Sequence, residues 1–383
     1  MSPDIFRELQ KRLDLYSVGF PATPSGIEIR VLKKLFSEED AAIFLSMTHL
    51  LEAPEAVAGK LGLPVPETRE KLADMARRGL LFSKVKGDTT CYGATPFVHG
   101  VFEYQVNRMD EEFAELMEEY EAEAFNHSLA QNASSVNRVV PVQKSLEVKH
   151  RAASYDDAVE ILRSKDKIVV AECICRKAQN VRDKGCGKEL EACFMFGSMG
   201  DYYLEHGLGR EASIDEAITI LEKARKQGLV TQPATSRNPA GMCNCCGDCC
   251  EFLKAVNSHP KPAQIVGSNH YAVLDRSLCK GCKVCIDRCQ TNALIMDADK
   301  LAVLNPDRCI GCGLCVTTCP SGALCLVPKP KKEQYKLPSD SMAQMTSLAI
   351  KRMAFNPILL IGNIQIQARI IVRMARRLVS NLF

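Results

Sequence analysis

Cysteine is almost absent from the first part of this chain. Residues 1–172 contain one cysteine, Cys91, whereas the whole sequence of 383 residues contains 19. The other 18 fall between Cys173 and Cys325, a density that calls for disulfides or bound metal. A chain of this length has room for two or three domains with real cores, so it does not need disulfides in place of a core.

The beginning of the sequence also lacks an uninterrupted apolar run. Residues 1–20 mix charged side chains with isolated apolar ones, unlike the apolar segment of a signal peptide. We therefore expect a cytoplasmic protein, where thiols stay reduced and dense cysteines are predicted to bind metal. With 46% apolar and 25% charged residues, the chain is neither disordered nor an ordinary integral membrane protein.

Motifs for flavin, NAD or nucleotide binding are missing as well. There is no GxGxxG after a predicted strand and no GxxxxGK[ST]. We predict no catalytic residue from the sequence. An electron-transfer component of an oxidoreductase system is therefore favoured over a stand-alone enzyme.

A direct repeat lies near the end of the cysteine-rich part. Residues 271–300 and 301–330 match at an offset of 30, and each half reads CxxCxxCxxxC. Each half is predicted to form a strand, a cysteine loop, about one helical turn and a second strand. Zinc generally prefers separated CxxC pairs or cysteine mixed with histidine, and this segment has no histidine between Tyr271 and Pro330. We therefore predict [4Fe-4S] clusters, with a pair of zinc sites as the alternative.

This repeat resembles the bacterial two-cluster ferredoxins over some 60 of the 383 residues. Cys319-Pro320 keeps the proline that follows the fourth cysteine in that family, whereas Cys289-Gln290 departs from it. In the family, the fourth cysteine of each motif binds the other cluster. The resemblance thus implies two [4Fe-4S] clusters, held by Cys279, Cys282, Cys285 and Cys319 (cluster one) and by Cys309, Cys312, Cys315 and Cys289 (cluster two).

Nine further cysteines precede the repeat, and the predicted strand 168–176 and the helix starting near 249 could bring them together. One or two additional Fe–S clusters are favoured there over structural zinc and over exchangeable thiols. Adjacent cysteines cannot easily all bind one metal, so we expect a subset to be ligands. The Cys-Cys-Gly at 245–247 resembles the cysteine-rich modules of heterodisulfide-reductase-like proteins. The candidates are Cys173, Cys175, Cys186, Cys193, Cys243, Cys245, Cys246, Cys249 and Cys250.

Residues 38–90 look like a winged helix-turn-helix, with three short helices and a hairpin that turns at 86–88. The third helix, 66–78, has four bases against three acids, and the following segment 110–123 has eight acids and no base. Phosphate binding needs a basic surface, so DNA is an improbable partner. We predict a packing or partner-docking role for this domain.

The C-terminal residues 341–383 carry six bases and no acid. From residue 357 onward the apolar side chains recur with helical spacing, which predicts a basic amphipathic helix that contacts either a membrane surface or a partner subunit. Without these six charges, residues 1–340 have a net charge of −3 in place of the +3 of the whole chain.

The sequence therefore predicts an α+β multidomain protein. Its expected parts are a winged-helix-like domain (1–100), an acidic helix and connector (101–150), a cysteine-rich α/β metal-binding domain (151–270), a dicluster ferredoxin-like module (271–330), and a linker with C-terminal amphipathic helices (331–383).

We interpret the chain as an iron–sulfur electron-transfer protein or subunit of an anaerobe. It would relay low-potential electrons to a redox partner protein or to oxidoreductase subunits. Residues 341–383 would give it a peripheral contact with the cytoplasmic face of the membrane. Two alternatives stay open. One is a redox- or iron-sensing winged-helix transcription regulator, and the other is a catalytic Fe–S subunit of a reductase, of the heterodisulfide-reductase-like or metallocofactor-activating kind.

Overall fold

The computed structural model describes residues 4–142 and 156–353. The chain forms two compact units, one built from residues 1–102 and 345–383 and the other from residues 103–344. Most of the predicted tail helix, including Arg369, Arg373, Arg376 and Arg377, lies outside the described residues. Among the described residues, no helix is both long enough and apolar enough to cross a membrane.

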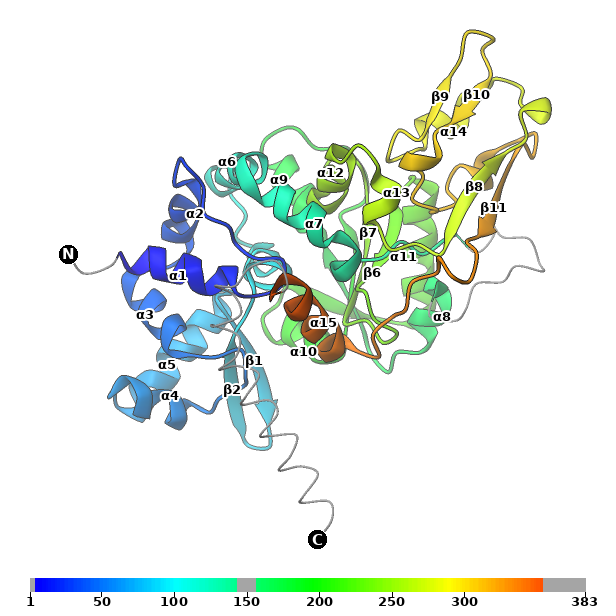
Figure 1. Ribbon diagram of the computed structural model, residues 1–383. Helices are drawn as coiled ribbons and strands as arrows, with labels where there is room; N and C mark the ends of the chain where they lie inside the picture. Colours follow the sequence, from blue (N-terminus) through cyan, green and yellow to red (C-terminus); the bar gives the residue numbers. More distant parts are fainter. Residues whose placement is uncertain (1–3, 143–155, 354–383) are drawn as a thin grey trace. The chain divides into compact units, whose positions relative to one another are not determined.

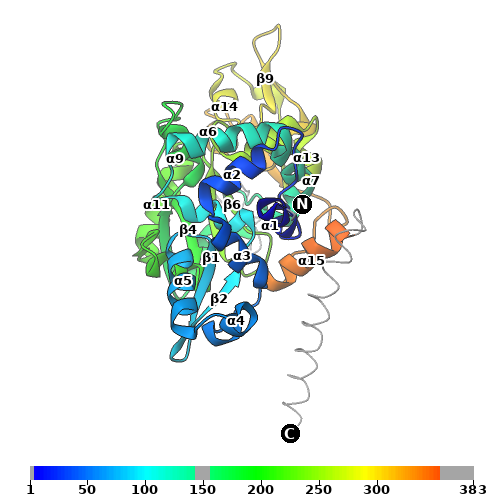
Figure 2. The same ribbon diagram turned by 90° about the vertical axis from the view of Figure 1, so that its left-hand side faces the viewer.

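The first unit contains helices and one hairpin (Figure 2). Its core is made of fully buried side chains such as Leu9, Val31 and Phe44, which recur on the inward faces of their helices. The expected order of three helices and a hairpin is present, while the assignment of this arrangement to the winged-helix family stays a prediction. The elements are α1 (Ile5–Asp14), α2 (Ile27–Leu35), α3 (Glu38–Ser46), α4 (Pro54–Leu61), α5 (Val65–Arg77), β1 (Leu81–Lys86) and β2 (Thr89–Ala94).

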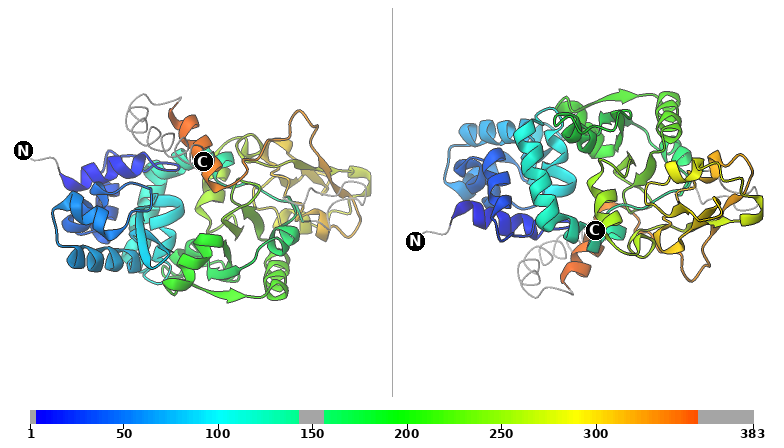
Figure 3. Two further views of the ribbon diagram at one scale, coloured as in Figure 1. Left: turned by 90° about the horizontal axis from the view of Figure 1, so that it is seen from below. Right: turned by 90° about the horizontal axis from the view of Figure 1, so that it is seen from above.

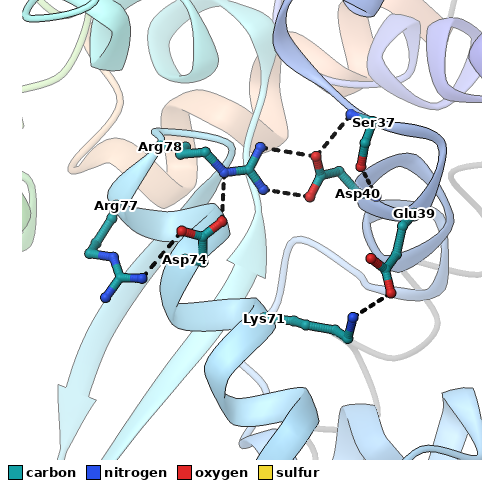
Figure 4. Close-up of polar contacts among 7 residues, drawn as sticks. All are labelled: Ser37, Glu39, Asp40, Lys71, Asp74, Arg77 and Arg78. Atoms are coloured by element: carbon teal, nitrogen blue, oxygen red, sulfur yellow. Dashed lines mark hydrogen bonds and ion pairs between the residues drawn. The ribbon is translucent and has the colours of Figure 1, made fainter.

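Helices α3 and α5 are joined by charged contacts (Figure 4). Ser37 caps α3 by accepting a hydrogen bond from Asp40 N (3.1 Å), and Asp40 returns one by accepting from Ser37 N (2.8 Å). Arg78, at the end of α5, donates to both oxygens of Asp40 and to Asp74 Oδ2. The cap of one helix is therefore tied to the C-terminus of the other.

The second unit is organised around a five-stranded antiparallel sheet with the order β5-β3-β4-β7-β6 (Figure 1). Its strands are β3 (Ile168–Glu172), β4 (Glu191–Phe196), β5 (Gly209–Ala212), β6 (Val230–Pro233) and β7 (Gly241–Cys245). The associated helices are α6 (Glu111–Tyr120), α7 (Asn126–Val136), α8 (Ala158–Arg163), α9 (Ile174–Asn180), α10 (Gly197–Glu205), α11 (Ile214–Lys226), α12 (Glu251–Ser258) and α13 (Pro262–Ile265). The acidic helix expected near 110–123 corresponds to α6, which lies beside α9 (Figure 2).

Alternation along the strands gives the two faces of this sheet different roles. Ile168, Val170, Phe194 and Met242 point to one face, where they form a core with residues of α8 and α11. Because successive side chains of a strand point to opposite faces, the intervening positions point the other way. Cys193, which pairs with Cys243 across β4 and β7, lies on that second face.

The repeat forms a module at one end of the second unit, coloured yellow to orange (Figure 3). Strand β8 (His270–Leu274) pairs with β11 (Leu324–Pro328), and β9 (Leu294–Met296) pairs with β10 (Ala302–Leu304), both antiparallel. The first strand of each half thus pairs with the second strand of the other half. A short helix, α14 (Val284–Asp287), follows the first cysteine loop, and α15 (Ser341–Met353) follows the module.

Candidate metal centres

Each cysteine loop of the repeat begins with a glycine in a left-handed conformation. Gly281 and Gly311 have φ of 66° and 69°. A Cβ at these positions would also clash with backbone oxygens, that of Lys300 for Gly281 and that of His270 for Gly311. Glycine is therefore required twice over, because it lets the loop turn tightly and lets another segment approach it closely.

The loops bring the eight cysteines of the repeat into two groups of four. One small cavity is lined by Cys289, Cys309, Cys312 and Cys315 together with apolar side chains such as Leu304. A second small cavity is lined by the four thiols of the other predicted quartet, Cys279, Cys282, Cys285 and Cys319. The fourth cysteine of each half thus faces the cavity formed by the first three cysteines of the other half.

Backbone amides point at the sulfur atoms with the same symmetry. Ala272 N lies 3.4 Å from Cys309 Sγ, and Ala302 N lies 3.4 Å from Cys279 Sγ, so the two halves donate to each other. Ala293 N donates to Cys289 Sγ at 3.2 Å. Burial raises the pKa of Cys312 to about 12. Donors aimed at sulfur stabilise a thiolate and its cluster against this cost of burial.

The two quartets differ in their access to solvent. Cys282 is exposed, and its neighbours Lys280, Lys283 and Val284 are exposed as well. In the other quartet, each of the four cysteines is partly buried, and Arg288 lies near Cys312 and Cys315. The quartet with Cys282 therefore lies at the surface of the unit, and the other is more enclosed.

Six of the nine upstream cysteines form a closed ring of thiol contacts. Each of these thiols interacts with two others, in the order Cys173, Cys193, Cys243, Cys245, Cys250, Cys175 and back to Cys173. Strand alternation places Cys193, Cys243 and Cys245 on one face of the sheet. Cys173 follows β3, and Cys250 directly precedes α12.

The other three upstream cysteines form a separate group. The sulfur atoms of Cys186, Cys246 and Cys249 all lie within 4.8 Å of one another, and the Cys186–Cys246 distance is 3.8 Å. Cys246 and Cys249 pack against Ala192 and residues of α11, on the face of the sheet opposite the ring. The hydrogen bond from Cys249, aided by Arg176, outweighs burial and lowers the pKa of Cys246 to about 6.

Arg176 lies between the two groups and is only 1% exposed. Its Nη1 donates to Asn244 O at 3.0 Å, while its Nε and Nη2 have no hydrogen-bond partner among the described residues. The sulfur atoms of Cys173, Cys193, Cys245 and Cys246 act on it electrostatically. A buried cation needs a compensating negative charge, so the surroundings of Arg176 favour anionic sulfur on both sides.

Gln290 connects the repeat to the upstream cysteines. Its Oε1 accepts a hydrogen bond from Gly247 N at 2.6 Å, and its backbone oxygen accepts one from Asn257 Nδ2 at 2.9 Å. Gly247 is needed for this approach, because a Cβ there would lie 2.6 Å from Gln290 O. The loop that carries Cys246 and Cys249 is therefore in direct contact with the residue after Cys289.

The sequence reasoning named all of these cysteines but did not separate the upstream nine into six and three. Part of this division could have been predicted from the i, i+2 spacing of Cys243 and Cys245, which puts both on one face of a strand. The roles of Arg176 and Gln290 were not predicted, because an arginine beside cysteines and a glutamine in place of proline have no distinctive pattern. Each of the 19 cysteines, all of which lie in the described ranges, is a free thiol. Cys91 lies in β2, and Cys325 lies in β11, in the lining of neither cavity.

Comparison with known proteins gives one match. Residues 278–323 match the family described as 4Fe-4S dicluster domain, which includes all eight cysteines of the repeat. A search of the curated proteins found no match to the chain. The chain is therefore a protein of mixed helices and strands that contains a 4Fe-4S dicluster domain next to a second cysteine-rich region.

Proposed function

We propose that this protein relays electrons through two ferredoxin-type [4Fe-4S] clusters to a further metal centre in its upstream cysteine region. The observation that carries the proposal is the grouping of the eight repeat cysteines around two cavities, within the segment that matches the dicluster family. Cys279, Cys282, Cys285 and Cys319 would hold one cluster, and Cys289, Cys309, Cys312 and Cys315 the other. When bound, each cluster accepts and gives up one electron at low potential.

The exposure of the cysteines suggests where electrons enter. Cys282 is exposed, and Leu278 and Val284, which are close to it in the sequence, are also exposed, by 48% and 39%. Lys280 and Lys283 add positive charge to this surface. We propose that an acidic electron-carrier protein docks here, since complementary charge speeds association.

The contact between Gln290 and Gly247 suggests where electrons go next. It joins the enclosed quartet to the loop that carries Cys246 and Cys249. We therefore propose an order from the exposed quartet to the enclosed quartet and then to the upstream cysteines. The cytoplasm, where free thiols persist, is the compartment this proposal assumes.

A transcription regulator has less support. All four bases of residues 66–78, which form most of α5 and its C-terminal end, are in ion pairs with carboxylates, so these bases are engaged in contacts other than phosphate binding. We propose instead that the first unit docks a redox partner.

Iron and acid-labile sulfide per chain, measured on anaerobically purified full-length protein with EPR, test the proposal. We expect at least about eight iron atoms and signals from two reducible clusters, whereas about twelve or sixteen would place one or two clusters upstream. Replacing Cys285 or Cys315 by serine should remove one cluster each. Cys325→Ser is the matched control and should leave the content unchanged. Fewer than about four iron atoms in the wild-type protein would contradict the proposal.

A further inference from the structure

Three cysteines of the upstream region, Cys186, Cys246 and Cys249, form a group of their own beside the ring of six. We infer that this group binds a single zinc ion through three thiolates and leaves the fourth coordination position of the ion to a solvent molecule. The inference goes beyond the proposed electron relay, because zinc has no redox chemistry and its binding here needs neither ferredoxin-type cluster. The redox-active upstream centre of the relay would then lie in the ring of six.

The spacing of the three sulfur atoms matches the ligand shell of one tetrahedral ion. All three lie within 4.8 Å of one another, and Cys186 Sγ and Cys246 Sγ are 3.8 Å apart. Zinc–sulfur bonds of about 2.3 Å at tetrahedral angles place two sulfur ligands of one ion roughly 3.8 Å apart. A [4Fe-4S] cluster binds each cysteine at a different iron, so its cysteine sulfurs lie further apart than these do. The group therefore fits one ion and is too small for a cluster.

The surroundings of the three thiols give the number of protein ligands. Within residues 4–142 and 156–353, no fourth histidine, cysteine or carboxylate joins the group. Asp248 is close in the sequence, but it is exposed and its Oδ2 pairs with Lys188 Nζ at 2.6 Å. The thiols of Cys245 and Cys250 interact with others of the ring of six. Three protein ligands are typical of a zinc ion that keeps one position open.

The group joins two segments that are far apart in the sequence. Cys186 lies between α9 and β4, whereas Cys246 and Cys249 lie in the loop between β7 and α12. Cys246 and Cys249 are buried in an apolar cluster with Ala192 and Leu229, while Cys186 is partly exposed. An apolar wall limits the access of water to a metal ion. Solvent therefore reaches the fourth position from the side of Cys186.

Arg176 supplies the counter-charge that three thiolates on one zinc ion require. Its side chain is only 1% exposed, and its Nε and Nη2 have no hydrogen-bond partner in the described part of the chain. Cys246 is among the sulfur atoms that act on it electrostatically. Three thiolates and one Zn²⁺ together carry a single negative charge, which offsets part of the cost of burying a cation, whereas neutral thiols do not. The buried arginine thus favours a group of thiolates that a metal ion holds together.

The chemistry of the ligands selects zinc among the common divalent ions. Thiolates are soft ligands, whereas magnesium, calcium and manganese prefer carboxylate and carbonyl oxygens. Zinc also binds a given site of this kind more tightly than ferrous iron does. An all-sulfur, tetrahedral group of this size is therefore assigned to zinc.

Zinc content and zinc K-edge X-ray absorption of the full-length protein test the inference, because neither measurement detects the bound iron. The protein is purified anaerobically from zinc-supplemented medium and dialysed to remove loosely bound metal. We expect about one zinc ion per chain, with three sulfur ligands at about 2.3 Å and one oxygen ligand at about 2.0–2.2 Å.

Variants assign the zinc to these thiols. The double variant Cys246→Ser, Cys249→Ser should lose the zinc and keep the iron of both ferredoxin-type clusters, which also reports that the second unit is folded. Cys186→Ser changes the partly exposed ligand and should weaken zinc binding by at least about tenfold in competition with a chelator, because changes to outer-shell partners alone cost this much. Cys325→Ser is the matched control and should retain the zinc of the wild type.

Several outcomes would overturn the inference. They are a wild-type protein without tightly bound zinc, zinc that stays in the double variant, and a fourth ligand that is a sulfur atom or an imidazole. About sixteen iron atoms per chain would also overturn it, since a second upstream cluster would need these thiols. Absence of the two ferredoxin-type clusters from the wild-type protein would instead contradict the proposed function and leave the zinc result unaffected.

Discussion

Two arginines show how burial decides what a charged residue needs as its partner. Arg78 is partly exposed and has two carboxylates, Asp40 and Asp74, within 2.7 Å of its nitrogens. Arg176 is buried and has no ion pair with a carboxylate among the described residues, and the sulfur atoms of Cys173, Cys193, Cys245 and Cys246 act on it electrostatically. A contact at the surface contributes little, whereas an unbalanced buried charge is costly. Arg176 therefore requires anionic sulfur beside it, whereas Arg78 has ordinary carboxylate partners.

Replacing Asp40 by asparagine should loosen α3 and α5. Burial by itself would raise the pKa of Asp40, but hydrogen bonds from Arg78 and Ser37 outweigh it and lower the pKa below 3.8. We expect a loss of about 1–3 kcal/mol at neutral pH, because the variant gives up charged hydrogen bonds. Hydrogen exchange of peptides from α3 and α5, corrected for intrinsic exchange rates, measures this loss of stability.

The direction in which this stability difference changes at low pH can also be predicted. A carboxyl group whose pKa is lowered by folding contributes stability above its unfolded pKa and loses it as the pH falls through its folded pKa. The difference between the wild type and Asp40→Asn should therefore be constant near neutral pH and narrow below about pH 4. Glu38→Gln, in the first turn of the same helix, is the control. A difference that widens on acidification would contradict the assigned role of Asp40.

At the scale of elements, the end of a strand separates neighbouring cysteines. Cys245 is the last residue of β7 and belongs to the ring of six, while Cys246 contacts Cys186 and packs near α11 on the other face. Cys249 and Cys250 are divided in the same way. Adjacent cysteines that cannot easily bind one metal can thus belong to two groups, because the chain leaves the strand after Cys245 and enters a helix after Cys250.

Gln290, which follows α14, contacts the loop between β7 and α12 through Gly247. Replacing its side-chain amide should weaken this contact. Gln290→Met keeps the length of the side chain but leaves Gly247 N without its acceptor, which we expect to cost about 1–3 kcal/mol. Electron transfer from the enclosed quartet to the upstream centre should slow, as followed by stopped-flow reduction with EPR of freeze-quenched samples. Gln334→Met, at an exposed glutamine, is the matched control. Unchanged transfer in Gln290→Met would show that this contact does not carry the path.

At the scale of the whole molecule, the distribution of charge limits the partners. The bases of α5 are paired with acids of α3, α4 and α5 itself. Arg69 Nη2 lies 2.7 Å from Glu55 Oε1. Lys71 contacts Glu39, and Arg77 and Arg78 contact Asp74 (Figure 4). The helix that would read DNA in a winged-helix protein therefore presents neutralised charges.

We expect the full-length protein to bind duplex DNA no more tightly than a non-specific contact, with a Kd of about 10⁻⁴ to 10⁻⁶ M at physiological salt. Oxidation of the clusters should leave this value unchanged. The double variant Glu39→Gln, Glu55→Gln removes one carboxylate partner each from Lys71 and Arg69, so its affinity for DNA and the salt dependence of binding should both rise. Fluorescence anisotropy with a labelled duplex measures the affinity, its salt dependence and its response to oxidation. Sequence-selective binding that responds to the redox state would favour a regulator instead.

Local patterns were enough to predict much of the fold. Helices and a hairpin lie where apolar spacing and turn residues indicated them, as α3 (Glu38–Ser46), α5 (Val65–Arg77) and α11 (Ile214–Lys226) show. The strand order β5-β3-β4-β7-β6 could not be predicted from the sequence, because pairing between distant strands leaves no local pattern. The match over 278–323 supports the ferredoxin-like module, while the winged-helix assignment stays a prediction.

The sequence by itself determined that this protein has two matching cysteine quartets, because ligand type and spacing are local properties that a 30-residue repeat displays twice. Only the tertiary structure decided how the nine upstream cysteines divide. Which sulfur atoms meet depends on strand alternation, on the pairing of Cys193 with Cys243, and on contacts between residues some 60 positions apart, such as Cys186 and Cys246. The near absence of cysteine before Cys173 thus marks where the cysteine-rich region begins, and the fold determines how the thiols of that region are grouped.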